Sequence, residues 1–334
     1  MKKKQIKEKD LKNKITKNLI KLLLSLPIKY EIKLDIPIFY GNKDFTFNNI
    51  KISLSLEKIR PKKTGHLEDY LSQKSKNKET DGGLTFKIEG YLGNKINQTF
   101  KTALSYIKLI IQRGLSNQII IISEQTSPFY LDDIPSVLFE KQDLKHIPHY
   151  ALKFKPQNSK QYKKISLPDD LSIFFDKLEL NLNDKKIHAD LEKNSPDFLK
   201  NTINEADELF YSTDENCRSI KSAIEWYIDA CANEERNISI SFLQICFGLE
   251  ALFSDDSDLI RKTISLKCAY SIARSAKERI IFIELIKDIY DLRCKIVHGS
   301  KLGIDDDHLS LYERGKLLLK ISIDNELTLA LNKK

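Results

Sequence analysis

Arg293 and His298 are the two residues whose types and spacing could do chemistry, and Gly299 follows them directly. A guanidinium carries a permanent charge and a fork of N–H donors that suits phosphate oxygens. An imidazole can give or take a proton near neutral pH. RNA supplies its own nucleophile, the 2′-hydroxyl, so cleaving it needs only a charge stabiliser and a proton-transfer group. The pair therefore indicates RNA cleavage without a metal.

The element that must position this pair is an apolar-periodic segment, 278–297, that predicts a helix. Glycine just past a helix commonly takes the left-handed conformation and ends it, so Gly299 places His298 at the C-terminus, where the macrodipole favours a cation. An ideal helix rotates Arg293 and His298 apart by about 140°. We expect the last turn to unwind, or a second copy to bring its own pair alongside. The core-facing stripe consists of Leu285, Ile289, Leu292 and Ile296.

Glu250 is a carboxylate in a segment, 242–253, that is otherwise apolar. Because a buried carboxylate needs a partner, we expect Glu250 to pair with Arg293 or Arg261 and to orient the site. A purely structural ion pair, or exposure at one face of the helix, is the alternative. The remaining supporting residues are neighbours of the pair in the chain: Cys294, Lys295 and Gly299.

Three stretches, 222–227, 242–253 and 289–299, carry a family resemblance in their order and separation. With them, residues 218–327 resemble the HEPN domain family and, within it, the Apea-like branch. The resemblance implies an α-helical bundle and metal-independent RNA cleavage by Arg293 and His298, with no cofactor. It also implies two HEPN units that meet at an interface, as a homodimer or higher oligomer. Such proteins are often toxins or antiviral effectors of bacteria.

Two features depart from the family pattern. Many catalytic members have a polar residue after the arginine, where this chain has Cys294. Residues 215–330 hold 16 Lys/Arg against 19 Asp/Glu, a net charge of −3. Either the basic N-terminal region binds RNA, or the domain is a non-catalytic HEPN module for dimerisation or for binding RNA or nucleotide. A third reading is a regulatory subunit whose basic arm docks on a partner protein.

The basic excess lies near the N-terminus. The 334-residue chain has a net charge of +8, and residues 1–20 hold eight lysines against Glu8 and Asp10. A basic arm suits nucleic acid or another acidic partner, although a lysine-rich composition alone can produce it. The candidate RNA-binding residues are Lys2, Lys3, Lys4, Lys62 and Lys63.

The five cysteines all lie in the C-terminal third, and none forms a C-x-x-C pair. An odd number of thiols at apolar helical positions is typical of buried, reduced cysteines in a cytoplasmic protein. No segment approaches the roughly 20 apolar residues of a membrane helix, and the run 19–28 lacks the cleavage residues of a signal peptide. We therefore expect a cytoplasmic protein without membrane contact.

The order of elements predicts an α+β chain. We expect a mixed α/β domain with antiparallel strands over 1–154, a linker over 155–168 and an all-α HEPN-like bundle over 169–334, the first acting as a sensor or recognition domain. Gly114 is expected to cap the helix 99–113, and Gly41 and Asn42 to form a hairpin turn. Strands are expected at 30–36, 50–56, 84–88, 91–92 and 118–123, a loop at 59–83, and the other helices at 5–26, 196–210, 219–231, 240–253, 259–274, 278–297 and 309–323.

Overall fold

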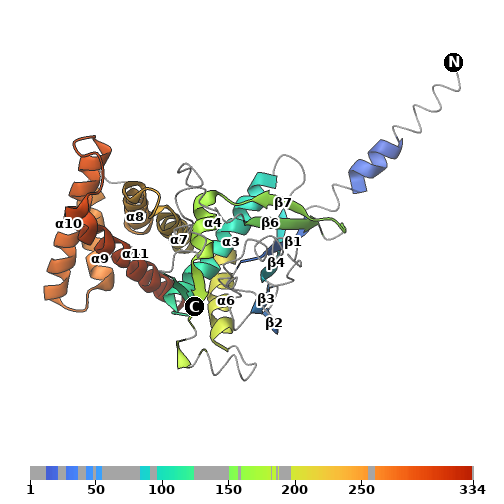
Figure 1. Ribbon diagram of the computed structural model, residues 1–334, viewed down its shortest axis with the longest axis horizontal. Coiled ribbons are helices and arrows are strands. Elements are labelled where there is room, and N and C mark those ends of the chain that lie inside the picture. The colour runs from blue at the N-terminus through green and yellow to red at the C-terminus, as the bar shows by residue number, and fades with distance from the viewer. Residues whose placement is uncertain are drawn as a thin grey trace, which may run out of the picture.

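The structure, a computed structural model, describes most of the chain between residues 13 and 332. It is an α+β protein and is mostly helical, with an antiparallel sheet near the N-terminus and a helical C-terminal part. Figure 1 shows the sheet and helices α8 to α11 at opposite ends, with α3, α4, α6 and α7 between them. The described residues are 13–21, 28–36, 43–47, 50–54, 83–90, 96–123, 150–156, 159–181, 183–185, 187, 197–254 and 260–332.

Six antiparallel strands form the sheet in the order β2-β3-β4-β1-β6-β7. Side chains alternate along the central strand, where Ile32 and Leu34 are fully buried, so the predicted period-two pattern is confirmed. Gly83 was predicted to lie in a loop but begins β4. Its φ of 126° and its contact with the Leu34 carbonyl exclude a Cβ there. The strands are β1 Ile28–Leu34, β2 Lys43–Phe47, β3 Ile50–Leu54, β4 Gly83–Gly90, β6 Ala151–Pro156 and β7 Lys163–Ser166.

The predictions at the N-terminus fall partly outside the described residues. Residues 13–21 are helical with exposed side chains, inside the helix predicted over 5–26. The described hairpin joins β2 to β3, whereas the predicted turn at 41–42, the strand at 91–92 and most of the loop at 59–83 lie outside the description.

The segment predicted as a linker, 155–168, belongs to the sheet. Its first residues end β6 and its middle forms β7, which pairs with β6 in antiparallel register. The flanking prolines and polar residues suggested a crossing, but Phe154 and Leu167 are buried, and Leu167 donates its N–H to the Tyr150 carbonyl. The polar residues of this edge strand face solvent instead of marking a break between domains.

Helix α3 (Ile96–Ser116) runs beyond its predicted end. Gly114 lies inside the helix and is not its cap. A Cβ at this position would come 2.5 Å from Ile120 Cδ1, so the glycine permits close packing. The left-handed residue after the helix is Gln118, with φ of 56°. The predicted strand near 118–123 is confirmed as β5 (Ile120–Ile122), and it pairs with β8 (Leu178–Leu180), a strand that the sequence did not predict.

Helix α3 lies between the sheet and the helical part. The Tyr106 ring packs on Phe86 of β4 at 5.0 Å and on Phe210 of α6 (Asp197–Tyr211) at 4.4 Å between centroids. One hydrophobic core runs from the sheet into the last helix, so the two predicted domains share a core. Two buried cations of α3 pair across this contact, Lys108 with Asp229 and Arg113 with both Glu205 and Asp324.

The C-terminal part is helical, as predicted, but the range 169–334 is not all-α because it contains β8. Asp214 caps α7, Asn237 caps α8 and Ser275 caps α10 by accepting N–H groups from the first turn. Gly248 of α8 lets Leu319 of α11 approach, since a Cβ would lie 2.5 Å from its Cδ2. The sequence pattern also suggests helix caps at Ser195 and at Ser257 or Asp258, and these residues lie outside the described part of the chain. The bundle helices are α7 Glu215–Asn233, α8 Ile238–Phe253, α9 Ile260–Ile272, α10 Ala276–Val297 and α11 Asp306–Asn332, and α4 (Asp169–Asp176) precedes them.

A membrane-crossing helix is absent from the described part of the chain, because no helix there is both long and apolar enough.

Candidate functional site

Helix α10 ends as the sequence predicted. His298 donates its N–H to the Cys294 carbonyl at 2.9 Å, and Gly299 takes the left-handed conformation with φ of 73°. Gly299 then donates to the Ile296 carbonyl at 3.1 Å, and nothing lies within 4 Å of the position of a Cβ. His298 is therefore the exposed C-cap of α10.

Arg293 lies one turn earlier and faces α8. Its Nη2 atom is 3.0 Å from Oε1 of Glu250, and the two side chains are 24% and 22% exposed. Of the two partners expected for Glu250, the structure selects Arg293. Arg261 instead pairs with Asp291 at 2.8 Å, and both of these side chains are about half exposed.

The Arg293–Glu250 contact is an ion pair that leaves polar atoms unsatisfied. Neither Arg293 Nε nor Glu250 Oε1 has a hydrogen-bond partner among the described residues, although both atoms are buried. Burial raises the pKa of the Glu250 carboxyl, and the positive charge of Arg293 opposes that rise. Buried donors without partners are rare, and they occur where a ligand or water completes the site. Arg293 thus keeps donor capacity for a further acceptor.

Two aromatic rings extend this arrangement across the bundle. The Arg293 guanidinium carbon lies 5.9 Å from the centroid of the Phe247 ring, and Phe247 packs on Trp226 at 5.2 Å. Trp226 of α7 is half-buried against Phe247 of α8. The stack holds the Arg293 side chain at the α8 surface.

The two catalytic candidates are not brought together by unwinding. The helix is regular through Val297, and the hydrogen bond from His298 to Cys294 continues it by one residue. In the described part of the chain the His298 ring has no hydrogen bond or ion pair, whereas Arg293 is engaged with Glu250. Of the two arrangements expected from the sequence, the unwound last turn is therefore absent.

Sequence reasoning missed a polar cluster in the turn after α10. Asp305 binds both the Lys301 ammonium, at 2.7 Å, and Nδ1 of His308. The hydrogen bond from Lys301, which has the larger effect, and the one from His308 lower the pKa of Asp305 to about 2. The turn is fixed to α8 because Ile304 donates its N–H to Ser239 Oγ at 2.8 Å. The sequence pattern favours solvated charge for the acidic run 305–307, and the signal that could have indicated the cluster is the spacing of Lys301, Asp305 and His308 at i, i+4 and i+7.

The remaining site candidates are residues of α10 and lysines outside the described part of the chain. Cys294 and Lys295 are exposed on α10, and the Lys295 carbonyl accepts the N–H of Lys301, which folds the turn back on the helix. All five cysteines are free, and only Cys294 is exposed, as expected for thiols on apolar helical positions. The proposed RNA-binding lysines (Lys2, Lys3, Lys4, Lys62 and Lys63) lie outside the described residues.

Among the described residues, no group of three or more His, Cys, Asp or Glu side chains could hold a metal ion. Comparisons of the chain with protein-family models, with curated proteins and with solved structures found no match.

Proposed function

We propose that this protein is a metal-independent endoribonuclease of the HEPN type, acting as an effector of a bacterial antiviral defence or toxin system. The observation that carries the proposal is the end of α10. Arg293 is held against Glu250 with a buried, unpartnered Nε, and an exposed imidazole caps the same helix. A phosphate oxygen would supply the missing acceptor.

The chemistry follows from these two side chains. The 2′-hydroxyl oxygen attacks phosphorus and loses its proton to a neutral imidazole, while the 5′-oxygen leaves with a proton from an imidazolium. The products are a 2′,3′-cyclic phosphate and a 5′-hydroxyl. Arg293 offsets the negative charge that develops on the non-bridging oxygens, and each proton transfer contributes roughly 10²–10⁴-fold. Glu250 touches no substrate and positions Arg293.

The proposed step uses one imidazole as base and another as acid, so it fits a homodimer that brings two copies of His298 together. Each chain presents one unpartnered His298 at the tip of α10. Apolar side chains flank it, with Val297 half-exposed and Leu302 fully exposed. Exposed apolar residues beside an incomplete site are typical of an interface between copies.

The test is RNA cleavage in EDTA by the wild type, Arg293→Ala and His298→Ala, with Arg261→Ala as the matched control. Arg261 pairs with Asp291 on the bundle surface, so its loss should leave the rate unchanged. We expect both site variants to lose at least about 100-fold. Equal rates in all four proteins would remove Arg293 and His298 from the mechanism.

A non-catalytic HEPN module for dimerisation or for RNA or nucleotide binding is the second candidate. It is favoured by the existing ion pair, because Glu250 already neutralises Arg293, and by Cys294 in the place of a firmer hydrogen-bonding residue. Protein that binds RNA without cutting it under any condition would establish this candidate.

Deleting residues 1–20 tests whether the basic arm docks on a regulatory or sensor partner. If it does, association with the partner should fall while the rate of RNA cleavage is unchanged.

We place the protein in the cytoplasm, supported by its five free thiols.

A further inference from the structure

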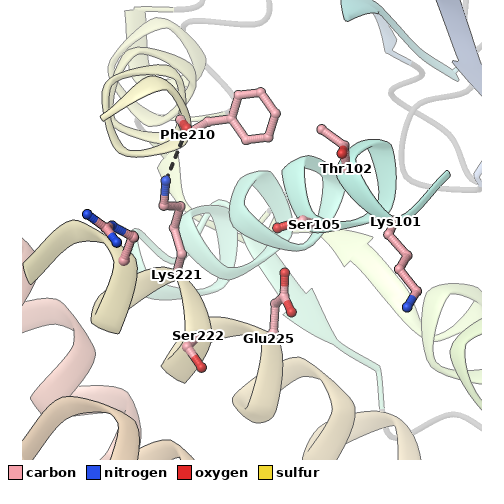
Figure 2. A pocket seen from close by; sticks show the side chains of 8 residues that line it. Lys101, Thr102, Ser105, Phe210, Lys221, Ser222 and Glu225 are labelled. Atoms are coloured by element: carbon pink, nitrogen blue, oxygen red, sulfur yellow. Dashed lines mark hydrogen bonds between the residues drawn. The ribbon is translucent and has the colours of Figure 1, made fainter. Parts of the chain in front are cut away.

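A pocket of about 410 Å³ opens between α3, α6 and α7, and it shares no residue with the Arg293 site. Figure 2 shows its walls, with α3 on one side and α7 on the other. It is the place where the helix that covers the sheet meets the bundle. Its lining consists of Lys101, Thr102, Ser105, Phe210, Arg218, Lys221, Ser222 and Glu225.

Two cations of this pocket are fixed by backbone carbonyls. Lys221 donates its ammonium hydrogens to the carbonyls of Phe210, at 3.3 Å, and Ser212, at 2.9 Å. Arg218 donates one N–H to the Thr213 carbonyl at 3.3 Å. An ammonium has three donors and a guanidinium has five, so both groups keep hydrogens for another acceptor. Carbonyls at the C-terminal end of α6 and just beyond it hold both cations in place before any ligand arrives.

The charges of the pocket do not balance. Lys101, Arg218 and Lys221 face one carboxylate, Glu225, and among the described residues no carboxylate lies within 4.0 Å of the three cations. Burial lowers the pKa of Lys221, and the like charge of Arg218 lowers it further, although Cys217 and Glu225 oppose this. A bound anion would offset both effects, and a phosphate offers several oxygens to such donors.

Glu225 makes the pocket less suited to an anion that carries no hydroxyl groups. In Figure 2 its carboxylate rises from α7 between Lys101 and Lys221, toward the part of α3 that carries Ser105. A carboxylate repels phosphate at short range but accepts hydrogen bonds from hydroxyl groups. Ser105 and Ser222 line the same space and add further hydroxyl partners. The pocket therefore combines a cationic end with a region suited to a polyol.

We propose that this pocket binds a phosphorylated sugar, either free or as the ribose phosphate of a mononucleotide. The phosphate lies against Lys221 and Arg218, and the sugar hydroxyls lie against Glu225 and Ser222. The Phe210 side chain forms the apolar wall. The inference does not depend on ribonuclease activity. A ligand here would bridge α3 and α7.

The test is calorimetric titration of the full-length protein with ribose 5-phosphate, AMP and inorganic phosphate. We expect at least one ester to bind about 10-fold more tightly than inorganic phosphate, because one charge-assisted hydrogen bond supplies that factor. Tighter binding of AMP than of ribose 5-phosphate would identify a nucleotide ligand, and equal binding a sugar phosphate.

Variants separate this site from chance binding. Lys221→Met should weaken the ester about 10-fold, and exposed Arg218→Met, which removes the second cation at the phosphate, repeats the test. Glu225→Gln should reduce the ratio of the affinity for the ester to the affinity for inorganic phosphate. The control variant Lys277→Met, at an exposed lysine, should leave both affinities unchanged. Each of three results would overturn the proposal: no binding of either ester, equal affinity for the esters and inorganic phosphate, or an ester affinity unchanged in Lys221→Met, Arg218→Met and Glu225→Gln.

Discussion

Arg293 and Glu250 lie 3.0 Å apart across the contact between α10 and α8, and each side chain is less than a quarter exposed. The pair joins the helix that carries His298 to the most apolar helix of the bundle. The two charged groups are close together, but Glu250 Oε1 and Arg293 Nε have no hydrogen-bond partner among the described residues. Glu250 thereby holds the Arg293 guanidinium against α8 while its Nε remains without an acceptor in the described part of the chain.

Replacing Glu250 should change how stability depends on pH. Burial raises the pKa of Glu250 in the folded protein above its value in the unfolded chain. Between those two values the folded state binds more protons, so the free energy of unfolding falls as pH rises through this window. Glu250→Gln removes that contribution. We expect the stability of the wild type relative to Glu250→Gln to decrease from about pH 4.5 upward.

Urea denaturation at a series of pH values measures this difference. Glu284→Gln is the control, because Glu284 is an exposed residue that pairs with Lys287 on the same helix. Parallel stability curves for the wild type and Glu250→Gln would contradict the prediction.

Two glycines should respond to alanine with opposite signs. Gly299 has φ of 73°, so Gly299→Ala should destabilise the protein by about 1 kcal/mol through backbone strain alone, since the space around it is open. Gly315 lies inside α11, and a Cβ there would make ordinary contacts at 3.5 Å or more. Gly315→Ala should therefore stabilise by about 0.5–1 kcal/mol. Thermal unfolding followed by circular dichroism tests both, and a shift of the same sign in the two variants would refute the argument.

Thiol chemistry should find a single accessible cysteine. Cys294 is exposed, whereas burial raises the pKa of Cys231 to about 11 and that of Cys268 to about 12. A disulfide reagent should titrate one thiol in the native protein and five after denaturation. Cys294→Ser should abolish the native reaction. Rapid modification of a second thiol in the folded wild type would show that the bundle opens.

Arg113 should be among the most sensitive positions outside the core. It is 8% exposed and pairs with Glu205 of α6 and Asp324 of α11, so Arg113→Met would leave two carboxylates without their shared partner. We expect a loss of about 3 kcal/mol in the free energy of unfolding. Arg261→Met removes an exposed pair with Asp291 and should cost at most about 1 kcal/mol. Similar losses from the two variants in urea denaturation would count against the buried network.

Local patterns predicted the bundle well because apolar spacing and caps act over a few residues. The stripe of Leu285, Ile289 and Leu292 is buried, and the glycine after His298 ends α10. Long-range features were not predictable in the same way. Gly114 resembles a cap until Ile120 is known to pack against it, and residues 163–166 look like a linker until β6 is there to pair with them.

The candidate site shows the same division. The carboxylate in an apolar helix predicted an ion pair, and the structure identified Arg293 as its partner. The pocket lined by Lys101 and Lys221 could not be found from the sequence, because 120 positions separate them and each lysine alone is ordinary.

The position of α3 limits how this protein can be divided. Its buried Lys108 and Arg113 neutralise Asp229, Glu205 and Asp324, which belong to three different helices of the C-terminal part. A fragment starting at residue 169 would keep those carboxylates and lose both cations, together with the Tyr106 ring that packs on Phe210. The C-terminal helices therefore depend on α3 for two buried counter-charges. A recombination event that exchanged the sheet would preserve these pairs only if α3 stayed with the C-terminal helices.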